Sequence, residues 1–152
     1  MSGHYFEVFV TVLPTLLAGF VETLRISLVG VIIGSVLGFF LGVVRGQRFA
    51  YVTPLIGGYL HILRGTPFLV QLYVVYFVLP SSGVSWLMMD SLTAALVSLS
   101  IYTSSYVTEI VSGAIRAIPI GQWEAALATG FKRTQMMRYI ILPQTVSLIL
   151  PS

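Results

Sequence analysis

The chain has 152 residues, of which 57% are hydrophobic and 9% charged, and its mean hydropathy is +0.95. A soluble domain of this composition would leave large apolar surfaces in water, so the chain belongs in a lipid bilayer. Its net charge of +3 would suggest nucleic acid in a soluble protein, but the basic residues lie between apolar runs. They are better explained as topology determinants, and no nucleic-acid partner is expected.

Residue types that carry enzyme chemistry are scarce. The chain has no cysteine, which removes disulfides, thiolate metal sites and a cysteine nucleophile. His4 and His61 are isolated from each other and from carboxylates at ligand spacing, which favours structural roles over metal binding. No Gly-x-Ser-x-Gly elbow or carboxylate pair accompanies the serines, so we expect no catalytic residue, metal or cofactor in this chain.

The first predicted membrane span contains the uncharged run from Ile26 to Val44, about 28 Å of helix against a hydrocarbon core of about 30 Å. We expect this helix to begin near Phe20. No Lys or Arg precedes Arg25, so the N-terminus lacks the basic region of a signal peptide and is expected to be retained. Glycines that recur every four residues predict a packing face for another helix: Gly30, Gly34, Gly38 and Gly42.

A second apolar region runs from Tyr51 to Leu79 and is interrupted by Arg64-Gly65-Thr66-Pro67. The part after Pro67 covers only about 18 Å, so we expect one helix that begins upstream and kinks at the proline. Arg64 would then extend to the nearer membrane surface. Pro80-Ser81-Ser82-Gly83 predicts a turn after this helix.

The third predicted span is uncharged from Ser91 to Thr108, follows Asp90 at its entrance, and is expected to continue to Ile118 before Pro119. It is rich in hydroxyls, which should face other helices or a wet cavity. Bonds to the backbone and contact with a solute explain them equally well. The residues are Ser98, Ser100, Thr103, Ser104, Ser105 and Thr108.

The charges predict the orientation of these spans. The basic residues of one side are Arg45, Arg48, Arg64, Arg116, Lys132, Arg133 and Arg138. The opposite side carries Glu7 and Asp90. By the positive-inside rule, the N-terminus lies outside and residues 117–143 lie in the cytoplasm.

Residues 117–143 predict a helical hairpin. Its first helix is expected near Gly121 to Thr129, with Gly130 as a left-handed cap and a second helix from about Thr134 to Ile141. Pro143 is expected to separate the hairpin from the next apolar run.

The residue types of the hairpin suit a partner's groove. Ala125, Ala126 and Ala128 would permit close approach, and Glu124 could pair with a partner cation. Apolar contacts would come from Trp123, Leu127 and Phe131. An amphipathic helix lying on anionic lipid explains the same composition equally well.

A family resemblance favours the first alternative. Glu124-Ala125-Ala126, then Gly130, then Ile140 and Leu142-Pro143 at their spacing resemble the cytoplasmic signature of ABC importer permeases. The stretches 64–72 and 118–124 resemble the polar amino acid branch, which includes histidine, arginine and glutamine uptake systems.

The resemblance implies an all-α integral membrane protein of the type I importer permease kind in the bacterial inner membrane. Residues 1–152 would be one transmembrane domain with three complete spans, the cytoplasmic hairpin and the start of a fourth span. The coupling residues it implies are Gly121, Trp123, Glu124, Ala125, Ala126, Gly130, Leu142 and Pro143.

The implied partners are a second permease subunit, the same or homologous, a cytoplasmic ABC ATPase and an extracytoplasmic solute-binding protein that delivers an amino acid. ATP and Mg would be bound by the ATPase, because this chain lacks a phosphate-cradling Gly-rich loop ending in Gly-Lys-Ser/Thr. The chain would transmit work and hydrolyse nothing.

Polar side chains on the second and third spans are candidate solute contacts, because ionisable or polar groups inside a membrane suggest a function. They are Gln71, Tyr73, Tyr76, Tyr102, Ser105, Tyr106 and Glu109. Glu22 and Arg25 form a further candidate pair, for which a structural ion pair is an equal explanation.

The chain departs from the family pattern at two places. Ser112 stands where many relatives have arginine, and Arg116 one turn later could compensate. The chain ends soon after Pro143, whereas the family continues through a fourth and a fifth span, so we expect it to be C-terminally incomplete. Two alternatives to an importer permease are a membrane assembly or interaction protein and a nonfunctional permease fragment.

Overall fold

The computed structural model describes residues 2–150, with side chains described from residue 7. The regular elements of this part are all helical, which confirms the expected all-α class. The α-helices are α1 (Ser2–Gly46), α2 (Val52–Gly65), α3 (Phe68–Tyr73), α4 (Ser91–Ala117), α5 (Ile120–Ala128), α6 (Arg133–Met136) and α7 (Leu142–Ile149). Shorter helical turns are the π-turns Val74–Val78 and Met137–Ile141 and the 3₁₀ turns Pro80–Ser82 and Ser85–Leu87.

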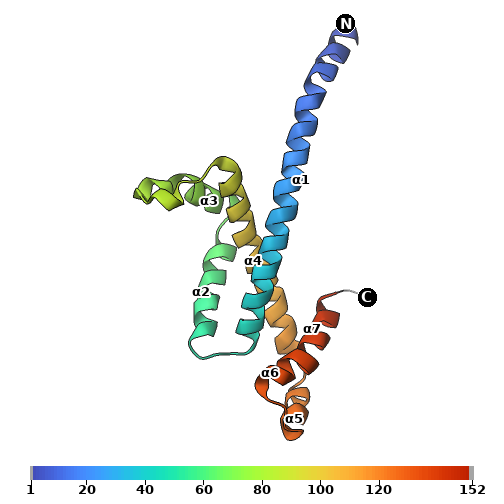
Figure 1. Ribbon diagram of the computed structural model, residues 1–152, viewed down its shortest axis with the longest axis vertical. Coiled ribbons are helices and arrows are strands. Elements are labelled where there is room, and N and C mark those ends of the chain that lie inside the picture. Colours follow the sequence, from blue (N-terminus) through green and yellow to red (C-terminus); the bar gives the residue numbers. More distant parts are fainter. Residues whose placement is uncertain (1, 151–152) are drawn as a thin grey trace.

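Helices α1 and α4 lie side by side and form the long axis of the molecule (Figure 1). Helix α1 already begins at Ser2 and continues through Pro14, so the helix itself starts well before the start near Phe20 predicted for the first span. Its 45 residues correspond to about 67 Å, roughly twice the hydrocarbon thickness of a bilayer. The N-terminal part of α1 therefore stands clear of the other helices at one end, and α5 lies at the other (Figure 1).

Two described helices are long and apolar enough to cross a membrane, Glu7–Gly46 and Ser91–Ala117. A third crossing is possible only if the bent pair of Val52–Gly65 and Phe68–Ser82 counts as one span.

Close packing of α1 on α4 is made possible by the glycines of α1. A Cβ atom on Gly34 would lie 2.6 Å from the Ser100 carbonyl oxygen, and one on Gly38 would lie 2.6 Å from that of Ser104. Gly30 and Gly42 face α4 in the same way, and Gly46 adds a fifth position against Ile115. The glycine face lets the two backbones approach to a distance that any side chain would prevent.

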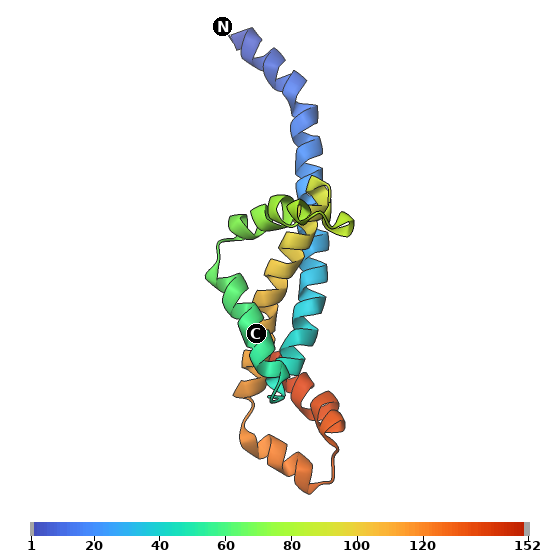
Figure 2. The same ribbon diagram turned by 90° about the vertical axis from the view of Figure 1, so that its left-hand side faces the viewer.

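The second apolar region does not form one kinked helix. The chain bends by 104° between α2 and α3, because Thr66 is extended before Pro67, whose ring fixes its own φ and removes a hydrogen-bond donor. Gln71 stabilises the break through Nε2, which donates to the carbonyl oxygens of Leu63 at 2.6 Å and Thr66 at 3.1 Å. Figure 2 shows α3 running across the long axis of the molecule.

Helix α4 begins and ends close to where the sequence predicts. Asp90 caps its first turn by accepting hydrogen bonds from the amides of Leu92 at 3.1 Å and Thr93 at 3.3 Å. The helix ends at Ala117, and Ile118 is extended before Pro119. The hydroxyls of its middle part are mostly buried and bond to carbonyls three or four residues back, as Ser98 does with Ala94 at 2.7 Å.

The second arm of the hairpin differs from the sequence prediction. Helix α6 begins at Arg133, continues into the π-turn Met137–Ile141 and then directly into α7. Pro143 lies in the first turn of α7 and does not separate the hairpin from the following helix. The π-turn accommodates the proline, because widening the preceding turn relieves the clash of its ring and the loss of its N–H.

Candidate functional site

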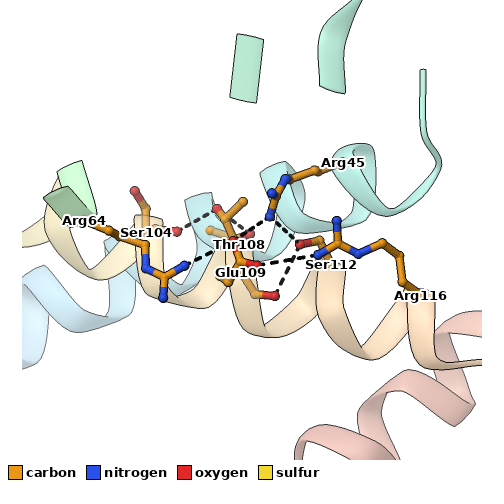
Figure 3. A network of polar contacts seen from close by, with 8 residues as sticks. Arg45, Arg64, Ser104, Thr108, Glu109, Ser112 and Arg116 are labelled. Carbon is orange, nitrogen blue, oxygen red and sulfur yellow. Dashed lines mark hydrogen bonds and ion pairs between the residues drawn. The ribbon is translucent and has the colours of Figure 1, made fainter. Parts of the chain in front are cut away.

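Four charged side chains from three helices meet beside the α1–α4 contact. Glu109 of α4 accepts from Nη1 of Arg45 at 2.6 Å, and Nη1 of Arg64 lies 3.2 Å from its Oε2. Arg116, two turns along α4, places Nη2 3.5 Å from Oε1. Figure 3 shows all three guanidinium groups directed to this carboxylate. We call Glu109, Arg45, Arg64 and Arg116 the Glu109 cluster.

The Glu109 cluster is only partly shielded from solvent. The side chain of Arg45 is 16% exposed, that of Glu109 34% and that of Arg64 41%. Three positive groups share one negative group, so the cluster keeps a surplus of positive charge beside a cavity of about 370 Å³ that is also lined by His61. Arg45 also donates to Ser112 Oγ at 3.1 Å.

Arg64 contacts Tyr106 as well as Glu109, and its side chain stays 41% exposed. The break after α2 directs it to Glu109, and its guanidinium carbon lies 5.4 Å from the ring centre of Tyr106. The hydroxyls of Tyr106 and Tyr102 are 3.0 Å apart, and Phe68 packs 5.1 Å from the Tyr102 ring. An aromatic wall therefore adjoins the Glu109 cluster.

The other candidate solute contacts are engaged elsewhere. Gln71 bonds to the break between α2 and α3. Ser105 is fully buried and donates to the Tyr102 carbonyl at 2.7 Å. Tyr76 packs edge-on against Phe77 at 4.7 Å, and Tyr73 lies against the same ring. Among the predicted contacts, the structure brings together Tyr102, Tyr106 and Glu109.

Two further polar contacts lie outside the Glu109 cluster. Glu22 and Arg25 form an exposed ion pair of 3.7 Å within α1. Tyr59 of α2 donates to the Ile101 carbonyl at 3.1 Å and contacts Ser104, which joins α2 to α4. The sequence reasoning missed Tyr59, because a single tyrosine in an apolar run carries no pattern. Among the described residues, no three His, Asp or Glu side chains come together as a metal site.

The hairpin has an inner face that packs against the end of α4. Its buried members are Ala126, Met136, Met137 and Ile141, which contact Val111, Ile115 and Ile118. We call these seven residues the hairpin core. Trp123, Phe131 and Leu142 pack partly against it. Trp123 and Phe131, expected to contact a partner's groove, thus face mainly inward, and so does Ala126.

The outer face of the hairpin is exposed. It presents Glu124, Ala125 and Ala128, together with Leu127, whose side chain is 60% exposed. Gly121 and Pro143 are exposed as well. This face combines one carboxylate, small side chains and one large apolar side chain, which is a composition suited to a protein groove.

Gly130 sets the angle between the two arms. Its φ of +81° lies in the left-handed region, where residues with a Cβ are strained. The amide of Phe131 donates to Ala126 at 3.1 Å and that of Gly130 to Leu127 at 3.0 Å, which closes α5. The second arm begins with the Gln135 side chain accepting from the Lys132 amide at 2.9 Å.

Residues 34–152 match the family described as the binding-protein-dependent transport system inner membrane component. The chain belongs to this family. The match extends from Gly34 of α1 through the hairpin to the end of the chain, so it includes both the Glu109 cluster and the exposed hairpin face.

Curated relatives are similar to this chain over most of its length. It is 37% identical to the probable amino-acid ABC transporter permease protein YckA of Bacillus subtilis, over 91% of this chain and 60% of the relative. It is 38% identical to the arginine transport system permease protein ArtQ of Bacillus subtilis, over 92% of this chain and 63% of the relative. The glutamine transport system permease protein GlnP of Escherichia coli is also 38% identical, over 91% of this chain and 63% of the relative.

A solved structure supports the same fold. The chain superposes with a TM-score of 0.80 and 34% identity on a crystal structure described as an amino acid ABC transporter with histidines. The match covers 96% of this chain and 67% of the solved chain. The chain therefore spans about 60 to 63% of the length of these curated relatives and two thirds of that solved chain.

Proposed function

We propose that this chain forms membrane-spanning helices and the coupling hairpin of a permease subunit in an ATP-driven ABC importer of polar amino acids. The observation that carries the proposal is the two-sided hairpin at residues 117–143, whose outer face is exposed while its inner face is packed on α4. The relatives described as arginine and glutamine transport permeases support the solute class.

The hairpin can act as a coupling element because it is attached firmly to the spans. Side chains of the hairpin core such as Ile115 and Ile141 are 1% and 0% exposed. A displacement of the outer face by a partner ATPase would therefore move the end of α4 with it, since closely packed interiors transmit strain. Closure of the ATPase on ATP and Mg would then alternate the solute pathway between outward and inward access.

The charge distribution supports a cytoplasmic hairpin and an outer N-terminus in a bacterial inner membrane. Arg48 and Arg133 line a cavity beside the first helix of the hairpin, whereas Glu7 lies in the second turn of α1 and Asp90 caps the start of α4. The α2–α3 pair then counts as a broken span between the two long helices, giving three crossings. A second permease subunit and an extracytoplasmic binding protein complete the proposed importer.

Glu109, Tyr102 and Tyr106 are the solute contacts that the geometry favours. A free amino acid carries an ammonium and a carboxylate, and the Glu109 cluster offers a carboxylate and surplus guanidinium groups within one cavity. The tyrosine ring faces could contact the ammonium group.

Co-purification tests the coupling role. The chain in mild detergent would be incubated with the ABC ATPase encoded beside it, comparing wild type with Glu124→Arg. Glu7→Arg is the matched control, because it makes the same charge reversal on an exposed position at the opposite end of the molecule. We expect wild type and the control to retain the ATPase and Glu124→Arg to lose it.

Other outcomes would contradict the proposal. If the wild-type chain is folded and monodisperse but captures no ATPase, a membrane assembly protein becomes the better explanation. If the chain does not insert into membranes at all, the nonfunctional fragment is favoured. If Glu124→Arg retains the ATPase as well as Glu7→Arg does, the outer hairpin face is not the contact.

A further inference from the structure

A cavity distinct from the one beside Glu109 lies between the hairpin and the turn that joins α1 to α2. Its volume is about 630 Å³, and three arginines line it: Arg48 of the turn, Arg116 of α4 and Arg133 of α6. We call it the arginine pocket. The other residues on its wall are uncharged, so no described carboxylate lines it.

The described protein groups neutralise the positive charge of the arginine pocket only in part. Arg48 makes no ion pair with a described residue. Arg116 reaches Glu109 only at 3.5 Å. Arg133 donates to the backbone carbonyl of Gln47 and lies 5.1 Å over the Phe49 ring, neither of which carries a charge. Three guanidinium groups around one cavity repel one another unless an anion joins them.

The backbone of the turn is held in a form that keeps Arg48 at the pocket. Its φ of +57° is in the left-handed region, which is uncommon for a residue with a Cβ and is maintained only where the surroundings fix it. Arg133 contributes to this by donating a hydrogen bond to the backbone carbonyl of Gln47, next to Arg48. The pocket is thus assembled from segments far apart in sequence.

We propose that the arginine pocket binds a phosphate monoester or diester group, and that its source is the headgroup of an anionic phospholipid. Planar guanidinium groups match phosphate oxygens in two-pronged hydrogen bonds, and basic pockets between membrane helices bind such headgroups. The rim of the pocket is apolar: Ile120 is 72% exposed and Trp123 lies beside it. Acyl chains attached to the phosphate would find contacts there, which a free phosphate would not need.

The bound headgroup would join the α1–α2 turn to the base of the hairpin. It would bridge Arg48 on one side and Arg133 on the other, adding to the existing Arg133–Gln47 contact. The attachment of the hairpin to the membrane-spanning helices would then depend on lipid composition. This inference does not rest on the transport proposal, because its readout is lipid binding by the chain itself.

Native mass spectrometry of the full chain, released from nanodiscs, tests the site. Nanodiscs of phosphatidylglycerol would be compared with nanodiscs of phosphatidylcholine, each with and without added inorganic phosphate. The pocket variants are Arg48→Asn, which suits the left-handed backbone, and Arg133→Gln. The matched control is Arg138→Gln, an arginine of the same hairpin arm that lies over Tyr139 outside the pocket.

We expect one retained phosphatidylglycerol on wild type and on Arg138→Gln, and about fivefold weaker retention in each pocket variant, the usual effect of one basic residue at an anionic surface. Equal losses in all three variants would overturn the proposal in favour of diffuse surface attraction. Equal retention of both lipids, with inorganic phosphate bound only when Arg48 and Arg133 are present, would keep the anion site and overturn the lipid source. Folding of each variant is checked by circular dichroism and gel filtration.

Discussion

The contact between α1 and α4 predicts opposite effects for the same substitution at two glycines. In Gly38→Ala, the new methyl group would lie 2.6 Å from the Ser104 carbonyl oxygen and 2.7 Å from Val107 Cβ. An ordinary carbon to oxygen contact is about 3.3 Å, so the overlap with the backbone is about 0.7 Å. A backbone carbonyl cannot rotate away as a side chain can, so the helices must separate.

The cost has two parts. Overpacking of a close contact destabilises by about 1 to 3 kcal/mol. Separation also weakens the bond from Thr108 Oγ1 to the Gly38 carbonyl, which measures 3.2 Å and contributes about 0.5 to 1.5 kcal/mol. Gly38→Ala should therefore lower the free energy of unfolding by about 1.5 to 4.5 kcal/mol.

Gly57→Ala is the matched control, because Gly57 lies inside α2 and its added Cβ would meet no described atom within 4 Å. Alanine favours helix over glycine by about 0.5 to 1 kcal/mol, so this variant should be neutral or slightly stabilised. Reversible unfolding of both variants in mixed detergent, followed by circular dichroism, measures the difference. If Gly38→Ala is no less stable than Gly57→Ala, the helices are not in contact as described and the reasoning fails.

Three further predictions concern single polar or turn positions. Glu109→Gln should lower stability by about 1.5 to 3 kcal/mol, the value of hydrogen bonds to a charged group, in the same unfolding assay. Gly130→Ala should cost about 1 to 2 kcal/mol, because its φ of +81° disfavours a Cβ. Hydrogen bonds from Thr93 and Leu92 hold the pKa of Asp90 below its ordinary value of 3.8. The α4 cap should therefore persist above pH 3.8 and weaken as the pH falls below it, in hydrogen exchange of those amides corrected for intrinsic rates.

Each of these predictions has a control. Glu22→Gln breaks only an exposed ion pair and should lower stability by less than about 1 kcal/mol. If Glu109→Gln lowers stability by no more than Glu22→Gln does, Glu109 does not hold α1 and α2 to α4 as described. Gly121 does not have a positive φ, so Gly121→Ala should be tolerated. If Gly121→Ala loses as much stability as Gly130→Ala, the positive φ is not the cause of the loss at Gly130. Asp90→Asn keeps an acceptor but not the titration, and a pH response that survives in this variant would assign it to another group.

The sequence predicted those parts of the fold that depend on local patterns. The glycine spacing identified the face of α1 that meets α4, because a bare face is a property of one helix. Asp90 and Pro119 marked the limits of α4, since caps and prolines act within a few residues. Gly130 was expected as a left-handed cap, and its φ has that sign.

The parts that depend on long-range contacts were not predictable in this way. The sequence around Pro67 is compatible with either a mild kink or a 104° bend. The bend is stabilised by the hydrogen bonds from Gln71 to the carbonyls of Leu63 and Thr66, which the sequence does not reveal. Arg45 and Arg64 appeared as separate topology signals, although both bind Glu109. The inward orientation of Trp123 and Phe131 depends on the packing of the hairpin against α4, which residue type alone does not determine.

Helix α4 connects the features that the proposed function requires. One face packs on the glycines of α1, so α4 cannot slide or rotate freely there. A second side carries Glu109, which ties α1 and α2 to α4 through charges that remain partly open to solvent. Its C-terminal end enters the hairpin core. Packing of this kind is stiff, whereas partly hydrated ion pairs can exchange partners at low cost. A displacement of the hairpin would thus rearrange the Glu109 cluster before it separates α1 from α4.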